Sequence, residues 1–454
     1  MDATRRDMHA FDEAEAGIVL DYLRERLELA EAPLDFPGNR KELEHLISGL
    51  ITEEGQDPQE ILNLYSETLA TTVLSTDSPR FLSFIPAAPT KSSLLFDSIV
   101  SAASLQGMSW LEAAGALVCE NQALRFIADV AGMPASAGGT FVSGGSAANL
   151  SALAAARDVG KRKNKTERVR IALSEQAHSS IGNSLRLLDV EPLILETDDE
   201  RLTAKSIERT LARDTNPIPV VAIAATAGTT NAGIVDDLQG VSEVCRERNL
   251  WMHVDGAYGL AAMLSPLTKS QFKGVENADS LITDPHKWWF APFDCAALLY
   301  REPRLAVDVH TQNASYLDVL HDDLPDNEFN PTDVAYHLTR RARGLAFWYS
   351  LVVNGTKAYE DAVTTSIELA QTTGKYIKTL PHLELIREPG LSIVLWRRTG
   401  WGLKEYQDFQ ERLLEKQIGF VTPSKWKGEV VGRFAFLHPH TTFDMVKEIL
   451  DFTN

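Results

Sequence analysis

The sequence predicts an α/β protein with a mostly parallel central sheet flanked by helices, an N-terminal helical segment and a small C-terminal α+β domain. Three observations lead to this class. Helical periodicity fills roughly the first 80 residues, short apolar runs alternate with helical stretches from Gly138 onward, and strand-like runs return among helices near the C-terminus. Strands that alternate with helices are typical of parallel sheets covered on both faces. The expected domains are residues 1–85, 86–355 and 356–454.

The N-terminal segment, residues 1–85, is expected to be helical. FDEAEAGIVLDYLRERLELA and RKELEHLISGLI carry apolar residues at helical spacing, and the proline and glycine of EAPLDFPGN separate them.

The large domain, residues 86–355, contains the predicted central sheet. Its expected strands are the apolar runs TFV, VRIAL, PLIL, VVAIAA, LWMHV, SLIT and CAALLY. The clearest unit is a strand in PVVAIAAT, a crossover helix in DDLQGVSEVCRER and a strand in LWMHVD. Ligands of such sheets bind at the carboxyl ends of the strands. The polar, acidic residues 308–335 are expected to form either a mobile active-site segment or an ordered surface excursion.

The C-terminal domain, residues 356–454, follows the helical run RRARGLAFWYSLVVNG. LSIVLW and VGRFAFL are its expected strands, and the residues between them are expected to be helical.

Composition favours a small-molecule ligand. The chain of 454 residues has 44 Lys and Arg against 63 Asp and Glu, and this net charge of -19 opposes binding to nucleic acid or anionic membranes. The sequence has no apolar signal core and no run of ~20 apolar residues, so a cytoplasmic location is expected. Cys119, Cys245 and Cys295 are too scattered for a disulfide framework or a zinc cluster, and no metal site is predicted.

The run DPHKWWFAPFD, residues 284–294, makes Lys287 a candidate Schiff-base residue. A partly desolvated lysine amine condenses with an aldehyde, and a substrate amine can later displace it. The alternative is that the lysine stem covers the faces of the neighbouring tryptophans.

Asp255 ends the strand LWMHV and precedes the small residues of GAYG. A carboxylate there could stabilise the protonated ring nitrogen of a pyridine aldehyde, or it could be a solvated side chain in a turn. Lys287 follows after about one further strand of the same sheet, so both groups can reach one pocket.

GGTFVSGGSAANLSALAAAR, residues 138–157, reads as a strand, a glycine turn and a helix. Gly144 and Gly145 permit close backbone approach, and the amides of Gly145, Ser146 and Ala147 could hold a phosphate at the helix start. An ordinary glycine turn is the alternative. The sequence lacks GxxxxGK[ST] and a full GxGxxG, which favours a simple phosphate over a nucleotide.

Three further polar positions follow strands of the predicted sheet. His178 could stack on a flat ring or be a packing residue, and His286 could contact a substrate carboxylate or a phosphate. In TAGTTNAG, Thr229 or Thr230 could offer a hydroxyl, or the run could be a polar turn.

Together these motifs resemble the group II pyridoxal-phosphate-dependent amino-acid decarboxylases, which include aromatic-amino-acid, histidine and glutamate decarboxylases. The resemblance covers most of the chain in family order: PRFLSFIPAAPT, GMSWLEAAGALVCENQAL, GGTFVSGGSAANL, SEQAHSSI, ATAGTTNAGIVDDL, HVDGAYG, DPHKWWFAPFDC and TRRARGLAFW. It implies the aspartate-aminotransferase-type fold (fold type I). It also implies a homodimer whose active sites lie at the interface and whose N-terminal helices clasp the partner.

The resemblance also implies roles for single residues around pyridoxal phosphate. Lys287 would form the Schiff base, Asp255 would pair with the ring nitrogen, and Ala257 and His178 would lie on the two faces of the ring. The phosphate would be held by the amides of Gly145 and Ser146, Thr230 would support Asp255, and His286 would lie near the substrate or the phosphate.

The implied reaction converts an L-amino acid to its amine and carbon dioxide. Tyr336, ahead of Arg340 and Arg341, is the nearest candidate for the tyrosine that helps to protonate the α-carbon in the family. Without such a tyrosine, oxidative deamination to an aldehyde becomes the alternative, and a non-catalytic scaffold is a third possibility. The resemblance also implies that the substrate pocket draws on the segments around residues 84–86 and Met108, whose predominantly apolar character favours an aromatic or other apolar substrate. A purely structural role for these side chains is the alternative.

Overall fold

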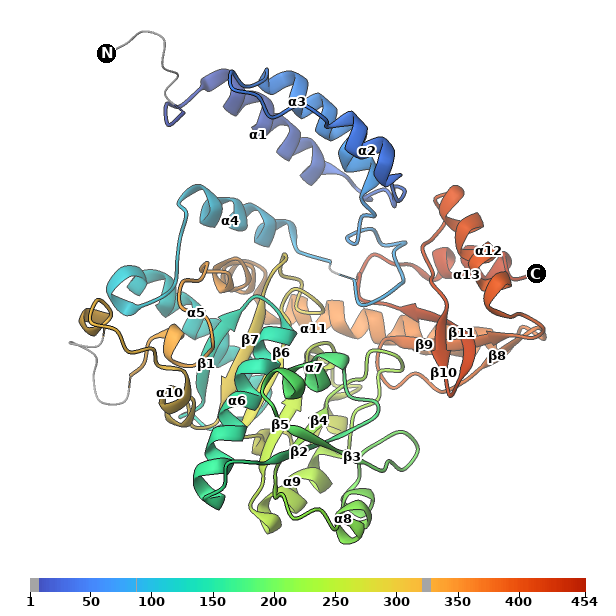
Figure 1. Ribbon diagram of the computed structural model, residues 1–454. Helices are drawn as coiled ribbons and strands as arrows, with labels where there is room; N and C mark the ends of the chain where they lie inside the picture. Colours follow the sequence, from blue (N-terminus) through green and yellow to red (C-terminus); the bar gives the residue numbers. More distant parts are fainter. Residues whose placement is uncertain (1–7, 87, 321–327) are drawn as a thin grey trace.

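A computed structural model describes residues 8–86, 88–320 and 328–454. Figure 1 shows a central sheet covered by helices, a smaller sheet beside the C-terminus and a helical arm at the N-terminus. The predicted fold class, an α/β protein with a mostly parallel sheet and a small C-terminal α+β unit, is confirmed. Among the described residues, no helix combines the length and the apolar character needed to cross a membrane.

The central sheet has seven strands in the order β1-β7-β6-β5-β4-β2-β3. All seven predicted apolar runs form strands, and β7 runs antiparallel to both β1 and β6, while the other pairs are parallel. Their bounds are β1 (Gly138–Val142), β2 (Arg170–Ser174), β3 (Glu191–Leu195), β4 (Val220–Thr226), β5 (Trp251–Asp255), β6 (Ser280–Thr283) and β7 (Ala296–Tyr300). The predicted crossover helix is α9 (Leu238–Arg248), between the parallel strands β4 and β5.

Helices cover both faces of this sheet, which explains why its strands are continuously apolar. Successive side chains of a strand point to opposite faces, so Ile223 and Ala225 of β4 join one core and Ala222 and Ala224 join the other. The first core includes α5 (Trp110–Val130), α9 and α11 (Gly344–Ile377). The second includes α6 (Gly145–Asn164), α7 (Ser179–Leu187) and α10 (Arg304–His310).

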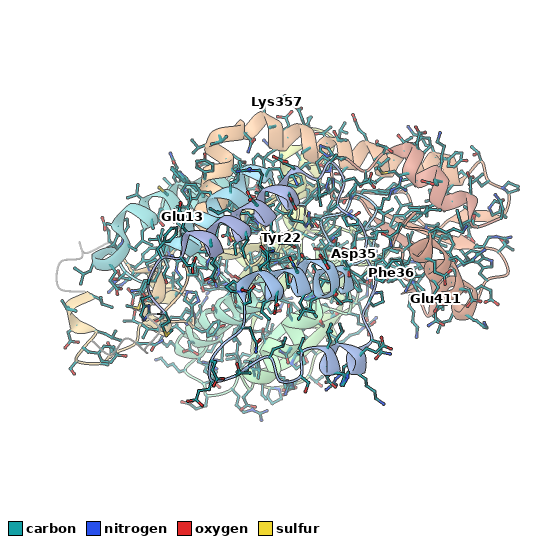
Figure 2. The ribbon with its side chains drawn as sticks, turned by 90° about the horizontal axis from the view of Figure 1, so that it is seen from above. Glu13, Tyr22, Asp35, Phe36, Lys357 and Glu411 are labelled. Carbon is teal, nitrogen blue, oxygen red and sulfur yellow. The ribbon has the colours of Figure 1, made fainter. Side chains whose placement is uncertain are left out.

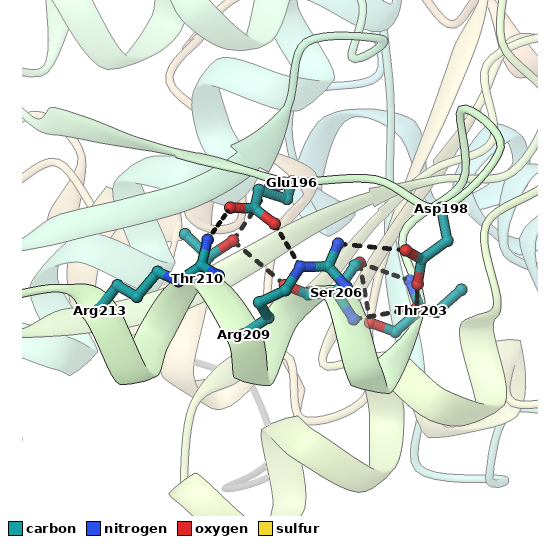
Figure 3. A network of polar contacts seen from close by, with 7 residues as sticks. All are labelled: Glu196, Asp198, Thr203, Ser206, Arg209, Thr210 and Arg213. Carbon is teal, nitrogen blue, oxygen red and sulfur yellow. Dashed lines mark hydrogen bonds and ion pairs between the residues drawn. The ribbon is translucent and has the colours of Figure 1, made fainter.

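A polar network fastens α8 (Ala204–Arg213) to the chain that leaves β3 (Figure 3). Arg209 forms ion pairs with Glu196 and Asp198, and Arg213 pairs with Glu196 at 2.8 Å. The N-cap Thr203 donates to Asp198 and accepts from the backbone of Ser206. Single exposed ion pairs contribute little to stability. Because Arg209 shares its charge between two carboxylates, this network stabilises the contact more than isolated pairs would.

The C-terminal unit pairs an antiparallel sheet, in the order β10-β11-β9-β8, with two helices. Its elements are β8 (Leu383–Leu385), β9 (Ile393–Arg398), α12 (Leu403–Glu415), β10 (Ser424–Trp426), β11 (Glu429–Ala435) and α13 (Phe443–Asp451). The two predicted strands are β9 and β11. The predicted boundary between residues 355 and 356 falls inside α11, where Gly355 interrupts the helix with a φ of 75°.

The N-terminal arm consists of α1 (Glu13–Glu28), α2 (Arg40–Leu46) and α3 (Pro58–Leu64), and none of these helices buries a side chain. It leads into α4 (Lys91–Ala102), which packs on α11. Figure 2 shows α1 crossing above the rest of the chain. Asp35 and Phe36, which follow this helix, lie on the side of Glu411 in α12. The arm is fastened by the Arg26–Asp77 ion pair and by the Leu34 amide, which donates to Gln417.

Candidate active site

A cavity of about 570 Å³ opens at the carboxyl ends of the parallel strands. It lies where parallel sheets place their ligands, because those strand ends and the helix starts that follow them leave polar backbone groups facing one space. Seven of the residues predicted for cofactor binding line it, and so does Tyr336. These residues are Gly145, Ser146, His178, Asp255, Ala257, His286, Lys287 and Tyr336.

Lys287 points into this cavity and does not cover tryptophan. Trp288 and Trp289 are fully buried in the core, where Trp288 stacks on Tyr258 and Trp289 donates to Thr283 at 2.8 Å. The lysine amine instead lies 2.8 Å from the Asp284 carboxylate at the cavity wall. These contacts favour the Schiff-base role over the covering role considered for Lys287, because its amine lies at the cavity wall beside Asp284.

Asp284 also lies at the site. It is part of the DPHK motif, but the sequence alone indicated no role for it. Its side chain is only 2% exposed, and its Oδ1 atom has no hydrogen-bond partner within the described part of the chain. Burial would raise the pKa of this carboxyl, but the Lys287 ammonium and His286 hold the pKa below its usual value. Asp284 thus holds the Lys287 amine at the cavity wall, and Lys287 must leave it before acting as a nucleophile.

Asp255 lies at the end of β5, buried to 4% exposure. Its Oδ1 accepts from the Ala257 amide at 3.0 Å, and its Oδ2 accepts from the Asn149 amide at 3.0 Å. Two donors on opposite oxygens fix the plane of the carboxylate. The remaining lone pairs are suited to a cationic N–H donor in the cavity.

The start of α6 provides the predicted phosphate turn. Gly144 is the N-cap, and the Ala147 amide donates to its carbonyl at 3.0 Å, which takes Ala147 out of the predicted donor set. The amides of Gly145 and Ser146 come before the first intrahelical bonds and remain for a ligand. The 20-residue helix directs its positive dipole end toward the cavity. His286 lies beside this turn, and its Nδ1 accepts from the Cys295 amide at 2.9 Å, which leaves Nε2 toward Asp284.

His178 is the N-cap of α7 at the cavity rim. Its Nδ1 accepts the Ser180 amide at 3.2 Å and lies 2.8 Å from the Ser180 hydroxyl. A nitrogen that accepts a backbone N–H carries no proton, so the ring proton of His178 is on Nε2. The imidazole is thereby held in one orientation, as a stacking group requires.

Thr230 is not brought to Asp255. Its side chain is exposed, and its backbone oxygen accepts from Arg433 at 2.5 Å. The turn after β4 directs the chain toward the C-terminal unit, so Asn149 takes the supporting position predicted for Thr230. Phe84 is 63% exposed, and residues 84–86 and Met108 do not line the described cavity.

Tyr336 is half exposed at the cavity, and its amide donates to Ser151 at 3.2 Å. Of the predicted excursion at 308–335, residues 321–327 lie outside the described residues.

Replacing Gly145 with alanine is expected to weaken binding of pyridoxal phosphate by about tenfold, because overpacking at a rigid contact typically costs this much. A Cβ at this position would lie 2.9 Å from Asp284 Oδ2, next to the helix start. Titration of the cofactor-free protein measures the loss. The control is Gly182→Ala on α7, where the new Cβ would meet no described atom within 4 Å outside its own helix. Equal affinities for the two variants would contradict the proposed phosphate turn.

Comparison with known proteins agrees with this geometry. Residues 37–399 match the family model of the pyridoxal-dependent decarboxylase conserved domain. The chain is 30% identical to the aromatic-L-amino-acid decarboxylase of Bacillus atrophaeus over 90% of this chain and 87% of that protein. It is 25% identical to the 3,4-dihydroxyphenylacetaldehyde synthase of Aedes aegypti over 93% and 84% of the two chains.

A solved structure, Oryza sativa TDC with PLP and tryptamine, superposes with a TM-score of 0.90 at 22% identity and covers 99% of both chains, which shows a shared fold. The matched family domain spans most of the chain, including every strand of the central sheet. The chain therefore belongs to the pyridoxal-dependent decarboxylase family.

Proposed function

We propose that this protein is a carboxy-lyase that binds pyridoxal phosphate and converts an L-amino acid to the corresponding amine and carbon dioxide. The observation that carries the proposal is the convergence of Lys287, Asp255 and the start of α6 on one cavity. A lysine amine, a buried carboxylate and a helix start match the aldehyde, ring nitrogen and phosphate of this cofactor. When bound, pyridoxal phosphate supplies a cationic ring that accepts the electron pair left by the departing carboxylate.

Each side chain then has a task that its contacts support. Lys287 would hold the aldehyde of the cofactor through its amine, which a substrate amine could replace. Asp255 would face the ring nitrogen, because two protein donors orient its carboxylate and leave room for a third. Ala257 and His178 would lie on the two faces of the ring, and the amides of Gly145 and Ser146 would bind the phosphate.

Asp284 positions the lysine, and proton return falls to Tyr336. Asp284 contacts the Lys287 amine at 2.8 Å and orients it in the cavity. Tyr336 lies at the cavity wall and is the proposed donor that returns a proton to the α-carbon. His286 is proposed to lie beside the phosphate or the substrate carboxylate, since it lines the same wall.

The proposed substrate is an aromatic or other apolar L-amino acid. The Bacillus atrophaeus relative, an aromatic-L-amino-acid decarboxylase, supports this class. The second candidate is oxidative conversion, in which the amino acid, molecular oxygen and water give an aldehyde, carbon dioxide, ammonia and hydrogen peroxide. The chain also matches an aldehyde synthase, and Tyr336, the proposed proton donor of the first reaction, is 52% exposed.

A homodimer is also proposed. The arm helices bury none of their own side chains, and apolar residues are exposed on the packed helices α4, α5 and α11. These residues are Leu95, Ile99, Leu111, Val118, Val352 and Val353. A second copy would cover such a patch, and sedimentation analysis would test it.

The predicted cytoplasmic location also stays a proposal, which cell fractionation would test.

A screen of the natural L-amino acids, with carbon dioxide, amine, ammonia and peroxide measured together, tests the reaction. We expect carbon dioxide and amine in equal amounts from aromatic or apolar substrates. Aldehyde, ammonia and peroxide from the same substrates would favour the oxidative reaction. Turnover of none of them, by protein that carries the cofactor, would favour a scaffold.

A further inference from the structure

Asp255 is supported by a buried chain of polar side chains that reaches away from the cavity. Asn149 is 1% exposed, and its Nδ2 lies 3.0 Å from Asp255 Oδ2 and 3.0 Å from Ser180 Oγ. On its other side, Asn149 Oδ1 lies 2.8 Å from Nε2 of His253, which is fully buried. Both hydrogens of this amide and one lone pair of its oxygen are therefore used.

The orientation of Asn149 follows from chemistry. A carboxylate can only accept, so the amide nitrogen must face Asp255 and the amide oxygen must face His253. The reverse orientation would bury two acceptors 3.0 Å apart with no proton between them. The amide oxygen in turn requires a proton on His253 Nε2.

The other end of this hydrogen-bond network also places the proton of His253 on Nε2. Trp251 can only donate, and its indole N–H lies 2.8 Å from Ser280 Oγ. The Ser280 hydroxyl then donates to His253 Nδ1 at 2.8 Å. Because Nδ1 accepts this bond, it carries no hydrogen, and the ring proton is on Nε2. Burial lowers the pKa of His253 to about 4 despite the nearby Asp255 carboxylate, so the ring stays neutral near pH 7.

The successive hydrogen bonds between Trp251 and Asp255 all run in one direction, toward the carboxylate. Trp251 donates to Ser280, Ser280 to His253, His253 to Asn149, and Asn149 to the carboxylate. Hydrogen bonds aligned in one direction polarise each other and strengthen the last bond.

We propose that Asn149 and His253 are positioning residues that hold Asp255 as an oriented carboxylate for the ring nitrogen of the bound cofactor. Neither touches the reacting atoms; they act through Asp255. This inference rests on the proposed function, because it assigns Asp255 to a ring nitrogen.

The test compares two ligands on the cofactor-free protein: pyridoxal phosphate and a phosphorylated analogue with carbon in place of the ring nitrogen. Asn149→Leu is expected to weaken pyridoxal phosphate binding by roughly 10- to 100-fold, as for loss of a hydrogen bond to a charged group. Affinity for the analogue should stay within about threefold of the unmodified protein. The matched control, Asn164→Leu, lies at the far end of α6 and should change neither affinity.

A second pair of variants tests His253 and keeps the inference open to refutation if Asn149→Leu fails to fold. His253→Gln can still donate to Asn149 and should keep both affinities within about threefold. His253→Leu cannot donate and should reproduce the selective loss for pyridoxal phosphate. In 15N-histidine solid-state NMR, the His253 signal, identified by its disappearance in His253→Gln, should show the proton on Nε2.

Equal weakening of both ligands in the Asn149 or His253 variants would overturn the inference, as would a proton on Nδ1 of His253. Unmodified protein that bound neither ligand would instead contradict the proposed function itself.

Discussion

Lys287→Ala is expected to abolish the covalent link to pyridoxal phosphate and to lower kcat by at least about a thousandfold, or roughly 4 kcal/mol in activation free energy. The amine of Lys287 is the one lysine amine that lines the described cavity. Without it the cofactor can bind only through its phosphate and ring contacts. No side chain then holds the aldehyde for exchange with a substrate amine.

Absorption spectra and borohydride reduction followed by peptide mass spectrometry measure the link, and carbon dioxide release measures the rate. Lys404→Ala, on the exposed face of α12, is the control and should keep both. A borohydride-fixed cofactor on any other lysine, or a retained rate, would show that Lys287 has been assigned wrongly.

Glu120→Ala is expected to lower the free energy of unfolding by about 3–5 kcal/mol, the usual cost of leaving one partner of a buried ion pair alone. Glu120 on α5 pairs with Arg340, and both side chains are at most 2% exposed. The same carboxylate accepts from the Gly344 amide at 2.8 Å, at the start of α11. Its removal leaves a buried guanidinium and frees the junction of two helices that cover the sheet.

Urea unfolding of the cofactor-free protein measures this loss. The matched control is Glu360→Ala, which breaks an exposed pair with Lys357 and should change stability by less than about 0.5 kcal/mol. If both variants unfolded at the same urea concentration, the buried pair would not have the stabilising role assigned to it.

Local periodicity was sufficient to predict the architecture of the large domain. The seven apolar runs became strands because helices cover both faces of the sheet, so each run had to be apolar throughout. Strands β8 and β10 were not predicted, because three residues are too few to display an alternating pattern.

The same local information located the cavity but not its supports. Asp255, Lys287 and His178 could be grouped because they follow strands whose carboxyl ends meet at one sheet edge. Thr230 satisfied the same rule, yet its turn leads to the C-terminal unit and its side chain faces outward. Following a strand therefore places a residue near the edge without fixing its direction.

By itself, the sequence determined the fold class, the family resemblance and the residues that end each strand, because these depend on local periodicity and short motifs. Only the tertiary structure decided that Lys287 turns toward Asp284 while Trp288 enters the core. It also brought Asn149 to Asp255 across 106 positions of chain. The physical reason is that such contacts depend on how α6 packs across β5, and no local pattern encodes that packing.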